Sequence, residues 1–193
     1  SPGAKWPIEN IYISTNEAYS HLVEEQLPEL PKQNILSEPI YRNTAPSTAW
    51  ACYRIRHICR DANLVVTPSD QAVINEDAFL ANIEAGFDFV GNNNSLLTMG
   101  VRPTRPEPGY GYIQLGNETE LSKIYRVKSF TEKPEREFAK MFIESDEFLW
   151  NTGCFMANVE YLIESLNKIL PSVMRVIDKE DITLSYQEEL DYV

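Results

Sequence analysis

The sequence predicts an α/β protein whose sheet is doubly wound, mixed and mostly parallel. Three observations lead to this prediction. Short β-branched or aromatic runs alternate with stretches of helical periodicity through residue 90, which is typical of parallel βαβ units. The apolar run at 64–67 fits a strand that is buried on both faces of a sheet. After residue 90 a β-rich insertion replaces the alternation, so we expect some strands to run against the others.

The first half contains, in order, a predicted strand at 11–13, a helix at 16–27, a strand at 34–36, a helix at about 45–62, a strand at 64–67 and a helix from residue 75 to near residue 86. Asn16 and Asn75 are the expected starts of two of the helices, and Pro28 stops the first of them. The long helix is expected to bury one apolar stripe, made of Ala51, Ile55, Ile58 and Ala62 and flanked by Cys52 and Cys59.

The second half is predicted to contain strands at 96–101, 111–115, 125–130 and 148–157, the middle two joined through Gly116 and Asn117. Pro134 opens a helix with Phe138, Met141 and Phe142 on one face. Asn158 caps a further helix that Pro171 ends. The tail from Arg175 is acidic and weakly patterned.

Composition excludes several classes of protein. The 193 residues are 43% hydrophobic and 24% charged, which is ordinary for a globular chain that folds without a staple. The formal net charge of −12 argues against a general nucleic-acid binder. No run approaches the roughly 18 apolar residues of a membrane span, and residues 1–6 lack the apolar core of a signal peptide. Three cysteines without a CxxC pair predict buried thiols in a reducing, cytoplasmic compartment.

Polar segments at strand ends are the candidate site, because doubly wound sheets bind ligands there. The first segment, 37–46, precedes a helix N-terminus, whose free N–H groups suit a phosphate or a base edge. Arg42 would add charge, and Asn43 and Thr44 would add hydrogen-bonding groups. The alternative is a plain connection in which Asn43 or Thr44 caps the helix.

Asp70 follows the most apolar strand, where it would either hold a divalent cation or cap the next turn. Gly111 enters a strand, which would let a ligand approach the backbone closely or would serve hairpin geometry. Glu132 and Asn151 would accept from and donate to sugar hydroxyls, and Lys133 would meet a phosphate. The alternative for these three is a surface ion pair and a tight turn.

Two further patterns bear on the substrate. Residues 100–140 carry eight basic against six acidic groups, so this stretch could receive an anion, although a solvated surface has the same pattern. The sequence lacks the P-loop, Gly-x-Ser-x-Gly and GxGxxG patterns, so kinase, serine-hydrolase and dehydrogenase activities lack their motifs.

Taken in order, these segments resemble the sugar-1-phosphate nucleotidyltransferases, and among them the mannose-1-phosphate guanylyltransferases. The resemblance runs from about residue 5 to residue 193 and is carried by five motifs: EPIYRNTAP at 38–46, PSDQ at 68–71, GYGYI at 109–113, FTEKP at 130–134 and WNTGCF at 150–155. Gln71 stands where the family usually has His. The implied fold is the Rossmann-like nucleotide-diphospho-sugar transferase fold.

The resemblance implies a role for each matching residue. Nucleotide binding falls to Glu38, Arg42, Asn43 and Thr44, and sugar binding to Gly111, Glu132 and Asn151. Asp70 would bind Mg²⁺ and, with Lys133, form the catalytic pair. The implied reaction transfers GMP from GTP to mannose 1-phosphate, giving GDP-mannose and pyrophosphate. The expected partners are these small molecules, not nucleic acid or a membrane, and a homo-oligomer is allowed.

The resemblance also implies a division of the chain. Residues 1–193 would form a single catalytic-domain fragment, with nucleotide binding in about 1–90, sugar-phosphate binding in about 91–175 and an acidic tail at 176–193. A glycine-rich segment would precede residue 1 and a second metal-binding Asp would follow residue 193, so we expect the fragment alone to be inactive. The open alternatives are another sugar 1-phosphate and nucleotide pair, or a noncatalytic nucleotide- or sugar-binding module.

Overall fold

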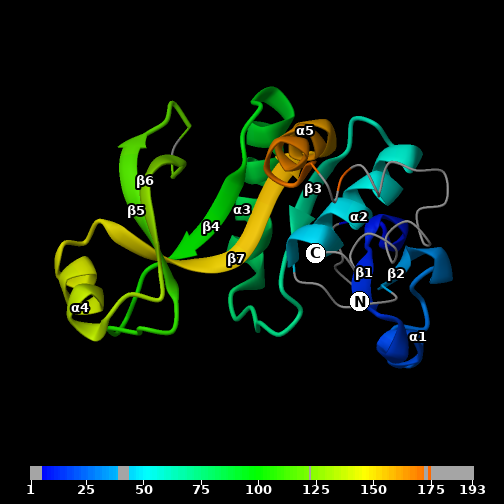
Figure 1. Cartoon of the computed structure of the whole chain (residues 1–193), viewed down its shortest axis with the longest axis horizontal. Coiled ribbons are helices and arrows are strands. Elements are labelled where there is room, and N and C mark those ends of the chain that lie inside the picture. The colour runs from blue at the N-terminus through cyan, green and yellow to red at the C-terminus, as the bar shows by residue number, and fades with distance from the viewer. Residues whose placement is uncertain (1–5, 39–43, 122, 172–173, 175–193) are drawn as a thin grey trace. The chain divides into compact units, whose positions relative to one another are not determined.

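The structure is a computed structural model that describes residues 6–38, 44–121, 123–171 and 174 (Figure 1). The chain forms two compact units, one made of the residues up to Ala62 and those from Asn158, the other of the residues between them. The predicted tail from Arg175 lies outside the described residues. The functional division near residue 90 stays a prediction.

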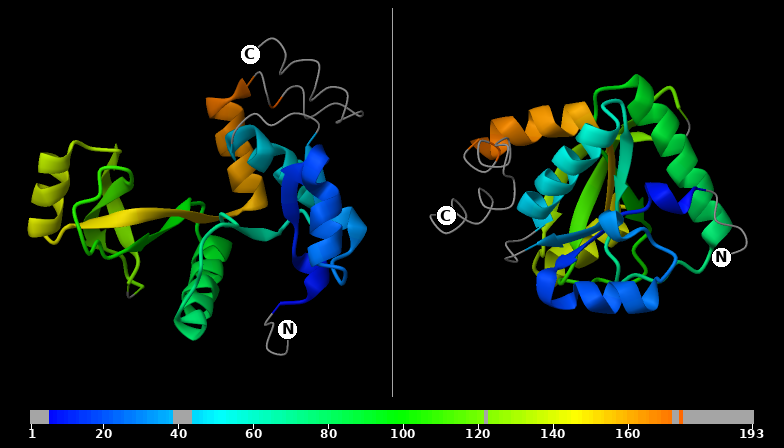
Figure 2. Two further views of the ribbon diagram at one scale, coloured as in Figure 1. Left: turned by 90° about the horizontal axis from the view of Figure 1, so that it is seen from below. Right: turned by 90° about the vertical axis from the view of Figure 1, so that its right-hand side faces the viewer.

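The first unit contains a pair of parallel strands with helices beside it. Strands β1 (Ile13–Asn16) and β2 (Ile35–Glu38) pair with Ile13 opposite Ile35. The right-hand view of Figure 2 places helices α1 (Ser20–Gln26) and α2 (Thr44–Ile58) on opposite sides of this pair. Helix α5 (Val159–Ile169) packs against α2. This parallel pair confirms the βαβ character expected from the alternating pattern.

Side-chain caps in this unit match the sequence prediction. The Asn16 side chain accepts a hydrogen bond from the Ala18 N–H, and Asn158 caps α5 by accepting from the Glu160 N–H. The first predicted helix is divided, however, into a 3-10 turn, Glu17–Tyr19, followed by α1. Two more 3-10 turns, Ile8–Asn10 and Lys32–Asn34, precede β1 and β2.

The prediction for the long helix was wrong in its end and in its buried face. Helix α2 ends at Ile58, whose side chain is 68% exposed, and Cys59 is exposed too. The buried residues are Thr48, Ala49, Trp50, Cys52 and Tyr53. The buried face contains the large aromatic residues Trp50 and Tyr53, whose burial contributes more than that of the expected stripe. Arg56 lies beside it, with its Nε 3.0 Å from Glu160 Oε1 of α5.

The second unit is built on five strands: β3 (Asn63–Val66), β4 (Leu97–Val101), β5 (Gly111–Glu118), β6 (Tyr125–Glu132) and β7 (Phe148–Asn158). The order is β3-β7-β5-β6, and β4 also pairs with β7, the long yellow strand in Figure 1. The pairs β4–β7, β5–β7 and β5–β6 are antiparallel. Helices α3 (Glu76–Asn92) and α4 (Arg136–Glu144) complete the unit.

The fold class is confirmed as α/β with mixed sheets. Parallel pairing is described for β1 and β2, whereas the β-rich insertion supplies the antiparallel pairs. Several details differ from the sequence prediction. Strand β3 is half-buried, and Gly116 and Asn117 lie within β5 because that strand continues to Glu118.

Two helices of this unit also differ from the prediction. Helix α3 begins after its expected cap, Asn75, but continues to Asn92, six residues past Gly86. In α4 the buried residue is Ala139, while Phe138 and Met141 are more than half exposed. Phe142 is the member of the predicted face that packs inward, against the rings of Tyr112 and Phe148.

Candidate functional site

The predicted nucleotide segment begins with a buried carboxylate. Glu38 ends β2 and is 3% exposed, and its Oε1 accepts hydrogen bonds from the hydroxyls of Ser14, at 2.8 Å, and Ser47. Glu38 thus links β1, β2 and the first turn of α2. Thr44 is the first residue of α2, and Arg42 and Asn43 lie outside the described residues. Their roles with a nucleotide stay predictions.

Four residues of the second unit form a row across neighbouring strands. Gly111 on β5 is paired with Glu132 on β6, and Gly100 on β4 is paired with Asn151 on β7. Tyr112 is paired with Trp150, so continuing that register by one residue brings Gly111 opposite Asn151. Residues directly opposite each other point to the same face of a sheet. Glu132 and Asn151 therefore share a face, with a glycine between them.

Gly111 is buried, and its missing side chain makes room for Glu132 and Phe130 on this face. A Cβ atom at Gly111 would lie 2.8 Å from Oε2 of Glu132 and 2.9 Å from Cζ of Phe130. Both distances are shorter than normal packing allows, so a larger residue would displace the carboxylate. The structure places Gly111 directly opposite Glu132, and the contact of either residue with a sugar stays a prediction.

The amide of Asn151 is held in one orientation. Its Oδ1 accepts hydrogen bonds from the Thr98 hydroxyl, at 3.2 Å, and from the Gly153 N–H, at 3.1 Å. With the oxygen engaged in this network, the Nδ2 group is left as a donor. Sequence reasoning missed Thr98, because a threonine inside a predicted strand carries no signal of its partner 53 residues away.

Lys133 follows Glu132 in a left-handed conformation, with φ of 45°. Its N–H donates to the Tyr110 carbonyl at 3.1 Å, which closes the end of the β5–β6 hairpin. Its Nζ lies 4.0 Å from Glu132 Oε1, and the Lys133 side chain is 68% exposed. The ammonium group therefore has solvent access beside the row, as a phosphate contact would require.

The Asp70 loop reaches the same part of β7. Gln71 Nε2 donates to the Thr152 carbonyl at 2.6 Å, and Gly153, with φ of +75°, lies against Pro68. Asp70 is exposed and has no hydrogen bond or ion pair with another described residue. The structure therefore brings the loop of Asp70 together with the bulge of β7 that follows Asn151.

The donor set at Asp70 fits magnesium. Among the described residues no three His, Cys, Asp or Glu side chains form a metal cluster. Magnesium does not need one, because it usually keeps several waters and binds one or two carboxylates together with substrate phosphates. An exposed carboxylate without a protein partner meets that requirement.

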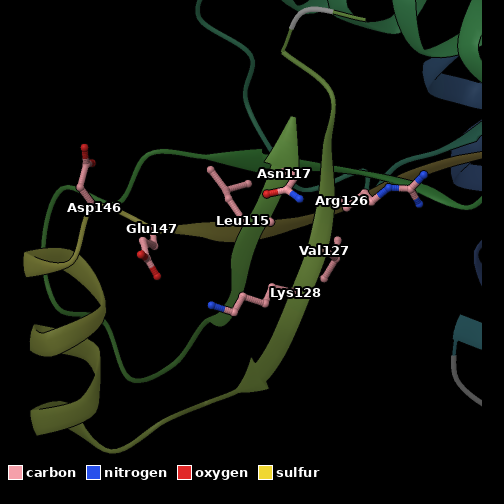
Figure 3. Close-up of a pocket in the computed structure, with 8 residues that line it drawn as sticks. Leu115, Asn117, Arg126, Val127, Lys128, Asp146 and Glu147 are labelled. Atoms are coloured by element: carbon pink, nitrogen blue, oxygen red, sulfur yellow. The ribbon is translucent and has the colours of Figure 1, made fainter. Parts of the chain in front are cut away.

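Two hollows lie in the second unit. One, of about 290 Å³, is lined by residues of the Asp70 loop, α3, β4 and β7, among them Gln71, Thr152 and Cys154. Burial raises the pKa of the Cys154 thiol, and a hydrogen bond with the Thr67 side chain lowers it in part. The other hollow lies between β5, β6 and the turn before β7, and Arg126 and Lys128 point in opposite directions there (Figure 3). Because those cations do not converge, that hollow is a poor anion site.

Comparison with known proteins gives one family. A family model described as Nucleotidyl transferase matches residues 4–186. A mannose-1-phosphate guanylyltransferase of Escherichia coli is 33% identical over 188 residues, which cover 94% of this chain and 40% of that relative. One of Salmonella montevideo is 36% identical over 170 residues, covering 84% of this chain and 35% of that relative. The chain therefore spans 40% or less of the length of these curated relatives.

Solved structures show the same fold. A mannose-1-phosphate geranyltransferase from Thermus thermophilus matches with a TM-score of 0.82 at 24% identity, over 95% of this chain and 54% of that chain. A mannose-6-phosphate isomerase from Helicobacter pylori matches with a TM-score of 0.73 at 27% identity, over 86% of this chain and 62% of that chain. These likenesses confirm the Rossmann-like α/β fold.

Proposed function

The chain belongs to the nucleotidyl transferase family, and on that premise we propose that it is part of an enzyme that transfers GMP from GTP to mannose 1-phosphate. Relatives named mannose-1-phosphate guanylyltransferase support this choice of sugar and nucleotide. The observation that carries the proposal is the row in which Gly111 separates Glu132 from Asn151. This row offers an acceptor and a donor on one face of the sheet, with the Glu132 side chain exposed, as a sugar with several hydroxyls requires.

The proposed reaction needs no protein nucleophile. A phosphate oxygen of mannose 1-phosphate attacks the α-phosphorus of GTP, and the bond from that phosphorus to the oxygen bridging to the β-phosphate breaks. GDP-mannose forms and pyrophosphate leaves. Because the attacking oxygen is already an anion, catalysis consists of positioning the two substrates and compensating their charge.

The residues of the second unit have distinct roles in this proposal. The Glu132 carboxylate accepts hydrogen bonds from sugar hydroxyls, and Asn151 Nδ2 donates one. The Lys133 ammonium holds the sugar phosphate as a point charge. Asp70 holds Mg²⁺, which when bound supplies positive charge to the phosphates. Glu38, Arg42, Asn43 and Thr44 are kept as the nucleotide-binding residues of the first unit.

The test measures pyrophosphate release with different substrate pairs in the protein that contains this chain. We expect pyrophosphate release with GTP and mannose 1-phosphate, and much less with UTP or dTTP and glucose 1-phosphate. A preference for one of the latter pairs would assign a different sugar and base. Calorimetry with GTP and GDP-mannose covers the remaining alternative, because binding without turnover would indicate a noncatalytic module.

Asp70→Asn tests the metal assignment separately. The variant should keep its fold, because the Asp70 carboxylate has no hydrogen bond or ion pair with another described residue. We expect it to lose magnesium-dependent turnover. Near-wild-type kinetics at saturating Mg²⁺ would refute the assignment of Asp70 as the Mg²⁺ ligand.

We further propose a cytoplasmic setting. Among the described residues no helix is both long and apolar enough to cross a membrane. The unpaired cysteines support a cytoplasmic location, and the substrates are small molecules. A homo-oligomer is compatible with these features.

A further inference from the structure

We propose that Gln71 is a positioning residue that holds the Asp70 loop against the bulge of β7 that follows Asn151. This inference rests on the proposed function, in which Asp70 serves the metal and Asn151 serves the sugar. Gln71 would act through both residues and would not touch the substrate itself. Its contribution is to keep the metal-binding carboxylate and the sugar-binding amide at a fixed separation.

The first observation is that the loop around Asp70 touches β7 on both sides of that residue. On one side, Pro68 lies so close to Gly153 that a Cβ there would be 3.2 Å from Pro68 Cγ. On the other side, Gln71 Nε2 donates to the Thr152 carbonyl at 2.6 Å. One residue earlier than Pro68, the Thr67 side chain forms a hydrogen bond with Cys154.

The second observation is that Asp70 has no anchor of its own. Its side chain is exposed and forms no hydrogen bond or ion pair with the other residues described. The position of its carboxylate must therefore follow the backbone on either side. Gln71 is the next residue along the chain, so its side-chain hydrogen bond is the nearest of these restraints.

The third observation is that the partner of Gln71 is itself fixed. The Thr152 hydroxyl donates to the Met99 carbonyl at 2.8 Å and accepts from the Cys154 N–H at 3.2 Å. The next peptide N–H, that of Gly153, donates to Asn151 Oδ1. The Gln71 amide and the Asn151 amide are thus connected through hydrogen bonds to one peptide group, that between Thr152 and Gly153.

A glutamine suits this role because its amide does not titrate. The Nε2 group donates at every pH at which the protein is folded. A histidine could donate to the same carbonyl through a ring N–H, whereas a methionine has no donor.

The test uses Gln71→Met, which keeps the length of the side chain and removes the donor, and Gln71→His, which restores a donor. Gln26→Met is the matched control, because Gln26 is an exposed glutamine on α1 without a side-chain hydrogen bond to the other described residues. Hydrogen exchange is followed at residues 69–73, and Mn²⁺ affinity is measured by water-proton relaxation. The rate of pyrophosphate release gives the Mg²⁺ concentration for half-maximal activity and the KM for mannose 1-phosphate.

For Gln71→Met we expect faster hydrogen exchange at 69–73. The affinity for the metal should fall, and the KM for mannose 1-phosphate should rise, each roughly three- to tenfold, while Tm stays unchanged. Gln71→His should recover both. Gln26→Met should match wild type throughout. Unchanged hydrogen exchange in Gln71→Met would overturn the proposal. Faster exchange with an unchanged metal affinity and an unchanged KM for mannose 1-phosphate would overturn it too.

Failure of the proposed function gives a different result. A wild-type protein that transfers no nucleotide to any sugar phosphate would refute that function. The role of Gln71 is then decided by exchange and Mn²⁺ affinity, which do not depend on turnover. Faster exchange and weaker Mn²⁺ binding in Gln71→Met would still support the positioning role, and wild-type values of both would refute it.

Discussion

Gly111 and Glu132 lie directly opposite each other on β5 and β6, so close that a Cβ on Gly111 would be 2.8 Å from Glu132 Oε2. We therefore expect Gly111→Ala to displace the Glu132 carboxylate from its place over Gly111. The affinity for GDP-mannose should fall by about tenfold or more, since one displaced charged hydrogen-bonding group is worth about 1.5–3 kcal/mol. Calorimetry of the variant against wild type measures this loss.

Gly109→Ala is the matched control in the same segment. A Cβ there would lie 3.3 Å from Oε1 of Glu107, which is the flexible end of a side chain and can move slightly. Its affinity should stay within about threefold of wild type. Equal losses in the two variants would mean that general rigidity of the segment matters and that the Gly111–Glu132 contact does not.

Thr98 fixes the Asn151 amide, so Thr98→Val should affect sugar binding without touching the sugar. In this variant Oδ1 of Asn151 loses the hydrogen bond from the Thr98 hydroxyl and keeps the one from the Gly153 N–H. We expect the KM for mannose 1-phosphate to rise roughly three- to tenfold, because the amide can turn over, while kcat changes less. Thr98→Ser should restore the wild-type KM. A Thr98→Ser variant as impaired as Thr98→Val would point to packing of the methyl group.

Lys133 offers a way to separate stability from function, because its φ of 45° suits glycine better than lysine. Lys133→Gly should keep the free energy of unfolding or raise it by up to about 1 kcal/mol, since the strain relieved exceeds the added chain entropy. It should raise the KM for mannose 1-phosphate about tenfold or more through loss of the ammonium group. Lys123→Gly is the control, because Lys123 is an exposed lysine with φ of 66°. It should show the same stability change and a normal KM; a raised KM in both would deny Lys133 a specific role.

The cysteines should differ in reactivity. Cys52 and Cys154 are buried, whereas Cys59 is exposed, so one thiol should react rapidly with a thiol reagent at pH 8 in the folded protein and three after unfolding. Cys59→Ser should remove the fast reaction. Rapid reaction of a second thiol in the folded variant would contradict the burial of Cys52 or Cys154.

Burial of Cys52 also predicts a pH dependence of stability. Its pKa is raised to about 12 in the folded protein from 9.0, so the folded state holds its proton where the unfolded state has lost it. Stability from this group is therefore complete below pH 9 and falls as the pH rises from 9 toward 12, by up to about 1.4 kcal/mol per pH unit. Denaturation of wild type and Cys52→Ala across this range should show a shallower fall in the variant. Parallel curves would refute the assignment.

Local sequence signals predicted most elements of the fold. Asn16, Asn75 and Asn158 cap the elements that follow them, as expected, because capping depends on a side chain and an N–H a few residues away. The buried faces of α2 and α4 were not predictable in the same way. Helix α2 packs against α5, more than 100 residues further along, and contacts so distant in the chain select the face that is buried; Arg56, for example, donates to Glu160, 104 residues away.

The candidate site shows the same division. Asp70, Gly111, Glu132, Lys133 and Asn151 could be selected from sequence, because each belongs to a short motif at the end of a predicted element. Thr98 could not be selected, and Gln71 drew notice only as a departure from the usual His. Their hydrogen-bond partners lie 53 and 81 residues away, and sequence periodicity does not report such distances.

The sequence by itself determined the α/β class, the order of the elements and the residue types offered to a sugar phosphate, because these follow from local periodicity, capping and motif. Tertiary structure decided which of those residues meet. The register that places Glu132, Gly111 and Asn151 in one row, and the hydrogen bond that joins Gln71 to Thr152, come from pairing between strands and loops distant in the chain. Such pairing is selected by packing of the whole unit, which no local stretch of sequence specifies.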